Sequence, residues 1–396
     1  MKRIFGLVPN VFFLGLVSLL NDVSGEMIFA IMPVFLTTVL GAPALILGFM
    51  EGFADALASI LRILSGKFSD KIQKRKRLAV IGYSLSTATR GVLAVVGNFW
   101  QVFVLRAIDR IGKGFRDSPR DALIANSVPK EEVGFSFGYH RAMDAIGSAI
   151  GPALGIALLL LLKNNFRLIF LIGFAIGFLA IFTFVFVQEV APGTVSAEAA
   201  KTKVFNFSLK EFSPRFKQYL LSLFVFGLGV MPISLMALKG SELRLGLTAI
   251  PAMYLIYVVS FMLFAIPFGK FSDRIGEERV ILGGFGIALM AYWILAYAHT
   301  SLMIALGFAV FGLYSAMTDG VERALASKLV TQTQTASGQG FVSAATGFSS
   351  LLAGVIGGYL WTLYGSKIAF SYGAILMIIG LLAFVVNVNH SRTRAA

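Results

Sequence analysis

Long apolar runs separated by short polar breaks dominate the hydropathy pattern of this chain. A helix needs about 20 apolar residues to cross the hydrocarbon of a bilayer, and the runs between the charged and Gly, Pro or Asn breaks have this length. A helix is stable in lipid because it satisfies its own backbone polar groups. The pattern predicts twelve helices at residues 8–39, 43–65, 78–97, 99–126, 133–162, 166–188, 217–239, 247–269, 279–298, 301–328, 336–363 and 367–388.

One long polar stretch divides these helices into two sets of six. It runs from Gln188 to about Arg215 and includes Pro192, Glu198 and Lys203. Such a composition is typical of a solvated linker. We therefore predict an all-α membrane protein with one bundle at 1–190, a cytoplasmic linker at 191–216 and a second bundle at 217–396.

The two halves repeat each other. Residues 66–72, GKFSDKI, return as residues 269–275, GKFSDRI, which lie 203 positions later. At a spacing of 202, residues 117–123 fall on residues 319–325. A same-sense duplication of a six-helix unit predicts a pseudo-two-fold axis along the membrane normal, with a substrate site between the halves near mid-membrane.

Composition agrees with a membrane protein. Hydrophobic residues make up 57% of the chain and charged residues 14%, whereas soluble domains have about 45 to 50% and about 25%. The net charge of +14 does not indicate nucleic-acid binding, because basic residues of membrane proteins collect in cytoplasmic loops. The absence of cysteine excludes disulfides and thiolate metal sites.

The basic residues also predict an orientation. The second loop is strongly basic, whereas the first (41–43) and third (97–98) loops carry no charge. The positive-inside rule therefore places the even loops and both termini in the cytoplasm, although Lys163, Arg167 and Arg244 run against it. We expect a multi-pass protein of the bacterial inner (cytoplasmic) membrane.

Two groups of motifs carry a resemblance to a known family. The second loop follows the pattern Gly-x-x-x-Asp-Arg/Lys-x-Gly-Arg-Arg/Lys, except for Gln73, at Gly66, Asp70, Lys71, Lys74 and Arg75. Its second copy keeps Gly269, Asp273 and Arg274, but Glu277 and Glu278 replace the basic residues. The fifth helix has the antiporter-like pattern Gly147-x-x-x-Gly151-Pro152-x-x-Gly155.

These motifs resemble those of the major facilitator superfamily, over essentially the whole chain. The resemblance implies twelve helices in two pseudo-symmetric six-helix bundles and, from the fifth helix, proton-driven export. The fourth helix matches the family pattern at Arg106 but departs from it at Asp109, Arg110 and Lys113. Residues 20–27 and 116–123 are also similar to sequences of one bacterial group within this superfamily. Some members of that group are linked to metal resistance or siderophore traffic.

The loop motif suggests a conformational latch centred on Asp70. Its carboxylate is suited to accept hydrogen bonds from the amino end of a neighbouring helix. Charges on the same cytoplasmic face are candidates to pair in the outward-open state, namely Asp70, Lys71, Arg75, Arg116, Arg120 and Asp121. The alternative is that the basic residues only anchor topology, which we expect for Lys74, Lys76 and Arg77.

Ionisable residues inside the predicted helices are the main site candidates, because each is costly in lipid unless paired or neutralised. Asp22 and Glu26, like Glu51 and Asp55, share a helix face. Two close carboxylates in a low-dielectric medium do not easily both stay ionised, so such pairs can carry a proton. Further candidates are Arg62, Arg90, Arg106, Asp109, Arg110, His140, Arg141 and Asp144.

Alternative interpretations remain open for these residues. Each charge can instead form a structural interhelical ion pair. A hard-ion site built from Asp22, Glu26, His140 and Asp144 is also possible. In the sparser second half, we expect buried charges and a cavity wall at Asp319, Glu322, Arg323, Tyr254, Tyr257, Tyr292, Trp293 and Tyr314, although aromatic residues often serve as packing or interface anchors.

The sequence thus predicts a secondary transporter rather than an enzyme, working by alternating access without a cofactor. The chain lacks a phosphate-binding loop, so ATP is not the expected energy source. We expect a monomer that interacts with lipid, protons and a small organic substrate, exported in exchange for protons. The alternatives are transport of a metal ion or anionic metal–siderophore chelate, favoured by the arginines in the predicted helices, and a non-transporting receptor or scaffold.

Overall fold

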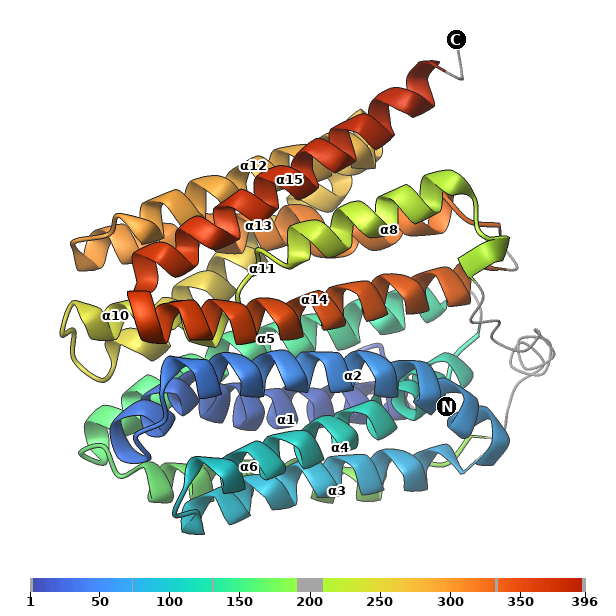
Figure 1. Cartoon of the computed structure of the whole chain (residues 1–396). Helices are drawn as coiled ribbons and strands as arrows, with labels where there is room; N and C mark the ends of the chain where they lie inside the picture. Colours follow the sequence, from blue (N-terminus) through green and yellow to red (C-terminus); the bar gives the residue numbers. More distant parts are fainter. Residues whose placement is uncertain (1–2, 73, 130–131, 191–208, 332–333, 394–396) are drawn as a thin grey trace. The chain divides into compact units, whose positions relative to one another are not determined.

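The structure is a computed structural model that describes residues 3–72, 74–129, 132–190, 209–331 and 334–393. Side chains at 62–72, 335–336, 387 and 389–393 lie outside this description. Apart from an isolated β-bridge between Ile4 and Leu7, the described residues form helices and loops (Figure 1). The prediction of an all-α protein is confirmed.

The helices follow the predicted order. They are α1 (Pro9–Val34) with η1 (Phe35–Val39), α2 (Ala44–Ile72), α3 (Arg75–Val92) with η2 (Leu93–Val95), α4 (Phe99–Asn126), α5 (Val133–Leu161), α6 (Phe166–Thr183) with η4 (Phe184–Phe186), η5 (Leu209–Glu211), α8 (Pro214–Gly227), α9 (Ile233–Ala237), α10 (Lys239–Glu242), α11 (Ala249–Ile275), α12 (Glu277–Ala296), α13 (Ser301–Lys328), α14 (Thr335–Tyr364) and α15 (Ser366–Thr393).

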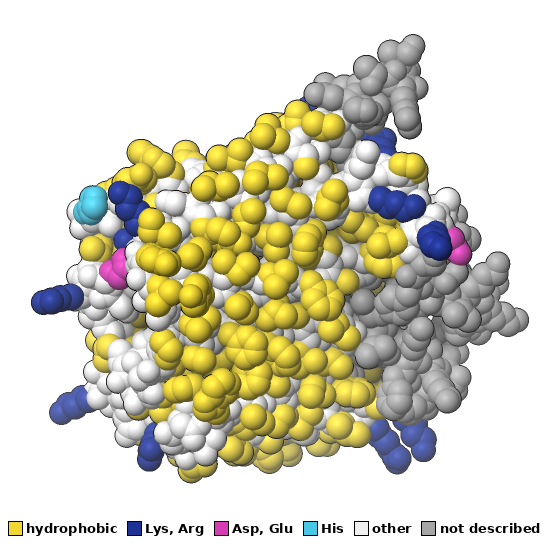
Figure 2. Space-filling view, in the orientation of Figure 1, with side chains coloured by type: hydrophobic (Ala, Val, Ile, Leu, Met, Phe, Trp, Pro, Cys, Tyr) yellow, Lys and Arg dark blue, Asp and Glu magenta, His cyan; other side chains and the backbone are white. Residues whose placement is uncertain are grey.

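Length and composition make ten helices of the described chain capable of crossing a membrane. They are Pro9–Val39, Ala44–Leu61, Arg75–Val95, Val133–Leu161, Phe166–Phe186, Ala249–Ile275, Glu277–Ala296, Ser301–Lys328, Ser337–Tyr364 and Ser366–Val386. Large hydrophobic side chains are exposed on them, and Figure 2 shows a largely hydrophobic face. Such a surface is suited to lipid.

The charged stretch around Asp70 is mostly helical, so the prediction of a loop between residues 65 and 78 is wrong. Helix α2 continues to Ile72, and α3 begins at Arg75. Lys, Arg and Gln are good helix formers, so charge alone does not end a helix. In the second copy the turn is confined to Gly276, whose φ of +96° favours glycine.

The predicted helix at 217–239 is broken. One helix ends at Gly227, and the next begins at Ile233. Pro232 cannot donate a backbone hydrogen bond. The free N–H of Met231 instead donates to the hydroxyl of Tyr292 on α12, at 2.6 Å. Hydropathy does not reveal this break, because the residues around it are apolar.

The chain forms two compact units. Unit 1 comprises Met1–Leu40 and Ile60–Lys203, and unit 2 comprises Gly41–Ser59 and Val204–Ala396. The first part of α2 therefore packs with unit 2, where a Cβ on Gly52 would lie 2.7 Å from the Leu351 Cα of α14. Most of the predicted linker at 191–216 lies outside the described residues, so the division into 1–190 and 217–396 stays a prediction.

Each unit has its own helix packing. In unit 1, α1 packs against α5 and α6, and α3 packs against α4 and α6. In unit 2, α13 packs against α11 and α12, and α15 packs against α8 and α12. The ring of Phe226 on α8 stacks on Phe285 of α12 with centroids 3.6 Å apart. Unit 1 contains most of the predicted ionisable site residues.

Candidate functional site

The antiporter-like glycines of α5 form a close seam with α1. A Cβ atom added to Gly147 would lie 2.9 Å from the Cβ of Asp22, and one added to Gly151 would lie 2.8 Å from the Cβ of Glu26. At Gly155 the added atom would lie 3.0 Å from the Met27 carbonyl oxygen. Small residues at this spacing let two helices approach closely. The seam therefore places both predicted carboxylates of α1 directly beside α5, which also contains Pro152.

A second link between these helices runs through Asp144. Its Oδ1 accepts a hydrogen bond from the Ser18 hydroxyl of α1, and its Oδ2 lies 3.5 Å from Nδ1 of His140. His140 is buried, and its Nε2 has no hydrogen-bond partner among the described residues. The carboxylate can therefore orient the imidazole, and the ring has a nitrogen available for a proton.

Arg141 does not join this group inside the bundle. Its side chain is 77% exposed, although one Nη atom lies 4.0 Å from Asp144. The expectation that Arg141 is buried is wrong, and its place in the functional site stays a prediction. Positions 140, 141 and 144 share a helix but not a face, since Arg141 is rotated by about 100° from His140.

Asn21 joins two buried arginines from different helices. Arg90 of α3 donates from Nη2 to Oδ1 of Asn21 at 2.9 Å and from Nη1 to the Ser24 hydroxyl at 2.8 Å. Arg116 of α4 donates to the same Asn21 oxygen at 3.2 Å and lies over the ring of Tyr83, 4.6 Å from its centroid. A neutral amide therefore holds two guanidinium groups together.

Arg106 and Asp109 line a small cavity in the same bundle. An Nη atom of Arg106 lies 3.8 Å from Oδ2 of Asp109, and its guanidinium lies 5.1 Å from the ring centroid of Phe29. The cavity has a volume of about 40 Å³ and is also lined by Gly25 and Arg90, which leaves room for about three water molecules. Charges of Arg90, Arg106, Arg110 and Arg116 act on Asp109.

Charges at the end of α4 pair with their neighbours along the helix. Arg120 donates to Asp121 at 2.9 Å and lies 3.5 Å from Asp117. The side chains of their predicted partners Asp70 and Lys71 lie outside the described residues, as do the contacts of the motif position Gly66 and the side chain of the separate site candidate Arg62. The latch around Asp70 stays a prediction.

In the described part of the loop motif, a carboxylate from outside the motif, that of Glu189, contacts the start of α3. Oε1 and Oε2 of Glu189 accept hydrogen bonds from the backbone N–H groups of Arg75 and Lys76, each at 3.0 Å. A carboxylate is favourable there because the first N–H groups of a helix have no partner within it. The interaction expected of Asp70 is thus made here by Glu189.

The second copy of the motif uses its acidic residues in ion pairs with other helices. Glu277 and Glu278 occupy the first turn of α12. Glu277 pairs with Lys328 of α13, and Glu278 pairs with Arg215 of α8 at 2.5 Å. Asp273 and Arg274 are exposed in the last turn of α11, shortly after Gly269. The acids that depart from the motif therefore connect helices within unit 2.

The carboxylates of α2 belong to unit 2 and not to the group around Asp22. Oδ2 of Asp55 accepts a hydrogen bond from the Ser350 hydroxyl of α14 at 2.9 Å. Glu51 is buried. Each lies in the part of α2 that packs with α14.

The predicted aromatic wall of the second half divides into two classes. Tyr254 stacks on Tyr257, which donates a hydrogen bond to the Ser315 hydroxyl at 3.3 Å, while Tyr314 packs against Phe226. Tyr292 is fully buried, and its hydroxyl accepts a hydrogen bond from the backbone N–H of Met231. It therefore does not line an open cavity.

Two other expectations for unit 2 are corrected. Trp293 is 66% exposed and lies against Tyr297, as an interface anchor would. Asp319 and Arg323 form an ion pair at 3.1 Å, with both side chains at least half exposed, so they are not buried charges. Glu322 accepts a hydrogen bond from Tyr219 only through its backbone carbonyl.

The hard-ion site is also not assembled. Among the described residues, no three His, Cys, Asp or Glu side chains are grouped so that they could hold a metal ion. Asp22, Glu26, His140 and Asp144 instead alternate with Ser18, Asn21 and basic groups along the α1–α5 seam. Spacing on one helix cannot predict this, because the ligand geometry depends on both helices.

Sequence reasoning missed three polar residues of α1, Ser18, Asn21 and Ser24. They are uncharged, so a search for intramembrane charges passes over them. Their spacing was a usable signal. Within two turns of an otherwise apolar helix, the sequence has four polar residues, Ser18, Asn21, Asp22 and Ser24.

An apolar helical protein that buries ionisable side chains has the architecture of a multi-pass membrane transport protein. The chain belongs to the Major Facilitator Superfamily, whose model matches residues 14–251 and 219–395. It is 32% identical over 391 residues to an uncharacterized MFS-type transporter of Methanocaldococcus jannaschii, covering 96% of this chain and 95% of the relative.

Other known proteins resemble the chain more distantly. The multi-drug resistance efflux pump PmrA of Streptococcus pneumoniae is 26% identical over 369 residues, covering 90% of this chain and 88% of the pump. A crystal structure of the nucleoside transporter NupG has a TM-score of 0.82 at 16% identity, covering 95% and 99% of the two chains. A POT family transporter in complex with 5-aminolevulinic acid has a TM-score of 0.78 at 14% identity, covering 99% and 98%. The two structures establish the major facilitator fold.

Proposed function

We propose that this protein is a proton-coupled exporter of a small organic molecule. The observation that carries the proposal is the α1–α5 seam, where Asp22, Glu26, Asp144 and His140 lie inside a bundle of membrane-spanning helices. Burying such groups in a membrane is costly, so their presence favours a role in transport. The similarity to PmrA supports export as the direction.

The transporter would have twelve spans in two six-helix bundles that move by alternating access. Ten spans are supported by apolar length. We assign α4 as a further span despite its charges, and α8 with α9 and α10 as a discontinuous one. Basic loops support an inner-membrane protein with both termini in the cytoplasm, and the monomer is the proposed functional unit.

Asp144 and His140 are the proposed proton carriers. Asp144 contacts Ser18 of α1 and His140 of α5, while the charges of Arg120, Arg141 and Asp117 also act on His140. Because Asp22 lies within electrostatic range of Asp144, Glu26 and Arg116, a proton gained or lost by one carboxylate changes the charge balance along the whole seam. This coupling would bias the packing of α1 against α5.

The proposal is tested with purified protein in proteoliposomes that contain a pH-sensitive dye. Amphiphilic drugs, divalent metals and citrate-type chelators are added under proton gradients of either sign. We expect drug-dependent proton flux by the wild type and flux near that of empty liposomes by Asp144→Asn. Glu132→Gln, the corresponding acid-to-amide change at a partly exposed residue that precedes α5 and pairs with Arg3, is expected to transport like the wild type.

An anionic metal chelate is the second candidate substrate. The positive charges of Arg90 and Arg106, which line the cavity beside Asp109, support this second candidate. Proton flux that responds to chelates and not to drugs would replace the organic-molecule proposal. The absence of proton flux with every compound and both gradients would favour a non-transporting receptor or scaffold.

A further inference from the structure

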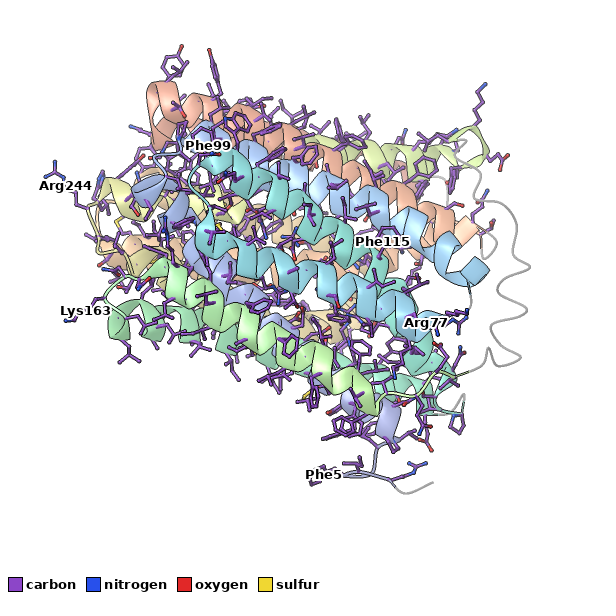
Figure 3. All side chains as sticks on the ribbon, turned by 90° about the horizontal axis from the view of Figure 1, so that it is seen from below. Phe5, Arg77, Phe99, Phe115, Lys163 and Arg244 are labelled. Carbon is purple, nitrogen blue, oxygen red and sulfur yellow. The ribbon has the colours of Figure 1, made fainter. Side chains whose placement is uncertain are left out.

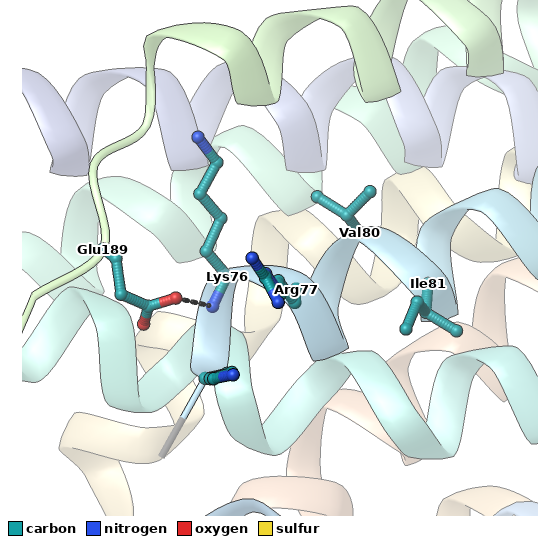
Figure 4. Close-up of a pocket in the computed structure, with 6 residues that line it drawn as sticks. Lys76, Arg77, Val80, Ile81 and Glu189 are labelled. Carbon is teal, nitrogen blue, oxygen red and sulfur yellow. Dashed lines mark hydrogen bonds between the residues drawn. The ribbon is translucent and has the colours of Figure 1, made fainter. Parts of the chain in front are cut away.

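An open groove beside the first turn of α3 is separate from the buried seam. It has a volume of about 600 Å³, and Figure 4 shows the residues around it. Three of its lining side chains are basic, two are aliphatic and one is acidic, namely Lys74, Lys76, Arg77, Val80, Ile81 and Glu189.

The charge of this groove favours an anion. Glu189 directs its carboxylate to the backbone N–H groups of Arg75 and Lys76, as the dashed line in Figure 4 shows for Lys76. Within the part of the chain that the structure describes, no acidic side chain forms an ion pair with Lys74, Lys76 or Arg77. Three cations therefore face the groove, and its one carboxylate is occupied by the helix terminus.

An apolar stripe continues from these cations along α3. Ile81, Val92 and Val95 are 60%, 48% and 76% exposed, and Ala88 between them is also exposed. These positions follow Arg77 by 4, 11, 15 and 18 residues, which at 100° per residue keeps them on one side of the helix. The same surface thus presents cations at one end and aliphatic side chains along most of its length, with the half-buried Ser84 between Ile81 and Ala88.

The part of the stripe nearest the cations, up to about Ala88, has the length of one leaflet. Half of a hydrocarbon core is about 15 Å thick, which corresponds to about ten helical residues. Starting at Arg77, this distance ends near Ala88. A free phosphate would use only the cations, whereas a phospholipid would use both the cations and the aliphatic stripe.

We propose that this groove binds an anionic phospholipid. Its phosphate contacts Lys74, Lys76 and Arg77, and one acyl chain lies along Ile81 towards Ala88. Basic side chains at the membrane surface attract anionic headgroups. The assignment to the cytoplasmic leaflet rests on the orientation proposed above, but the binding site itself does not depend on transport.

Native mass spectrometry of the full-length protein in detergent tests the proposal by titration with phosphatidylglycerol and, separately, with phosphatidylcholine of the same chain lengths. We expect the wild type to prefer phosphatidylglycerol. The double variant Lys76→Gln/Arg77→Gln is expected to lose about tenfold or more in phosphatidylglycerol affinity.

The matched control removes two exposed basic residues at the opposite end of unit 1. Lys163 and Arg77 lie at opposite ends of its helices (Figure 3), so Lys163→Gln/Arg167→Gln has the same net charge change without touching the groove. Its affinity is expected to equal that of the wild type. Equal losses in both double variants would overturn the site, because binding would then follow net charge alone.

Two further arms separate a lipid from a free phosphate. Ile81→Gln is expected to weaken long-chain phosphatidylglycerol but not its dihexanoyl form. Soluble glycerol 3-phosphate that competes as well as the lipid would show a free-phosphate site and overturn the proposal. Since binding is measured without transport, lipid selectivity with no proton flux would refute the exporter alone, and proton flux without lipid selectivity would refute the lipid site alone.

Discussion

At the scale of single residues, Asn21 has the most consequential position in unit 1. Its side-chain oxygen accepts hydrogen bonds from Arg90 and Arg116, and its amide nitrogen donates to Asp22 at 2.9 Å. An amide can do this because it has acceptor and donor groups at once. It connects α1, α3 and α4 without adding a charge.

Replacing this amide should destabilise the protein. In Asn21→Ala, two buried guanidinium groups lose an acceptor, and hydrogen bonds to charged groups are the strong ones. We expect a loss of about 3 kcal/mol, measured as a lower apparent melting temperature in detergent.

Asn98→Ala is the matched control for this variant. Asn98 accepts only the Gln101 N–H at the exposed start of α4, and loss of such a cap costs about 1 kcal/mol. Equal destabilisation by the two variants would show that Asn21 does not hold the arginines together.

At the scale of helices, the α1–α5 seam explains why the fifth-helix motif needs glycine. The positions at Gly147, Gly151 and Gly155 approach backbone or Cβ atoms of α1. A side chain at these positions would push α1 and its carboxylates away from α5. The motif therefore specifies a helix contact, and its connection to the proposed proton transfer is the position of Asp22 and Glu26 on the other side of that contact.

A methyl group at the centre of the seam should disturb both packing and transport. In Gly151→Ala, the new atom would lie 2.8 Å from the Glu26 Cβ and 2.9 Å from the Met27 backbone nitrogen. Overpacking of this kind typically costs about 1 to 3 kcal/mol. We expect a lower melting temperature and reduced proton flux.

Gly138→Ala is the matched control on the same helix. A Cβ there meets no atom within 4 Å, and alanine is a better helix former than glycine by about 1 kcal/mol. This variant should be as stable as the wild type or more stable. If Gly151→Ala behaved in the same way, the seam would not be closely packed in the membrane.

At the scale of the whole molecule, α2 links the two compact units. Its first part packs with α14, and its continuation from Ile60 belongs to unit 1. A movement of one unit relative to the other must therefore be accommodated in or beside this helix. Such a position is consistent with a membrane protein that changes conformation during transport.

The orientation proposed above predicts opposite exposure for the two ends of α13. Because the chain has no cysteine, each single-cysteine variant is labelled at the introduced residue alone. Ser301 and Ser327 are exposed in the first and last turns of α13. A membrane-impermeant maleimide on intact cells should label Ser301→Cys, and should label Ser327→Cys only after permeabilisation.

The two variants control each other, since both replace an exposed serine by its near-isostere on one helix. Labelling of Ser327→Cys alone in intact cells would reverse the orientation. Labelling of both variants in intact cells would contradict α13 as a single membrane span.

The sequence by itself determined the all-helical membrane fold and the superfamily. Apolar runs long enough to cross a bilayer force helices on any chain in lipid, because unpaired backbone groups are too costly there. Motifs such as the glycines of α5 consist of residues close together in the sequence, so they can be recognised without knowing which helix packs against them. The same reasoning located the ionisable residues of α1, α4 and α5, because charges stand out in apolar runs.

Only the tertiary structure decided which partners these residues have. It placed Ser18 against Asp144, Asn21 between Arg90 and Arg116, and Glu189 at the start of α3. It also turned Arg141 and Trp293 outward. These outcomes depend on how distant helices cross and rotate against each other, which a pattern along one helix does not contain.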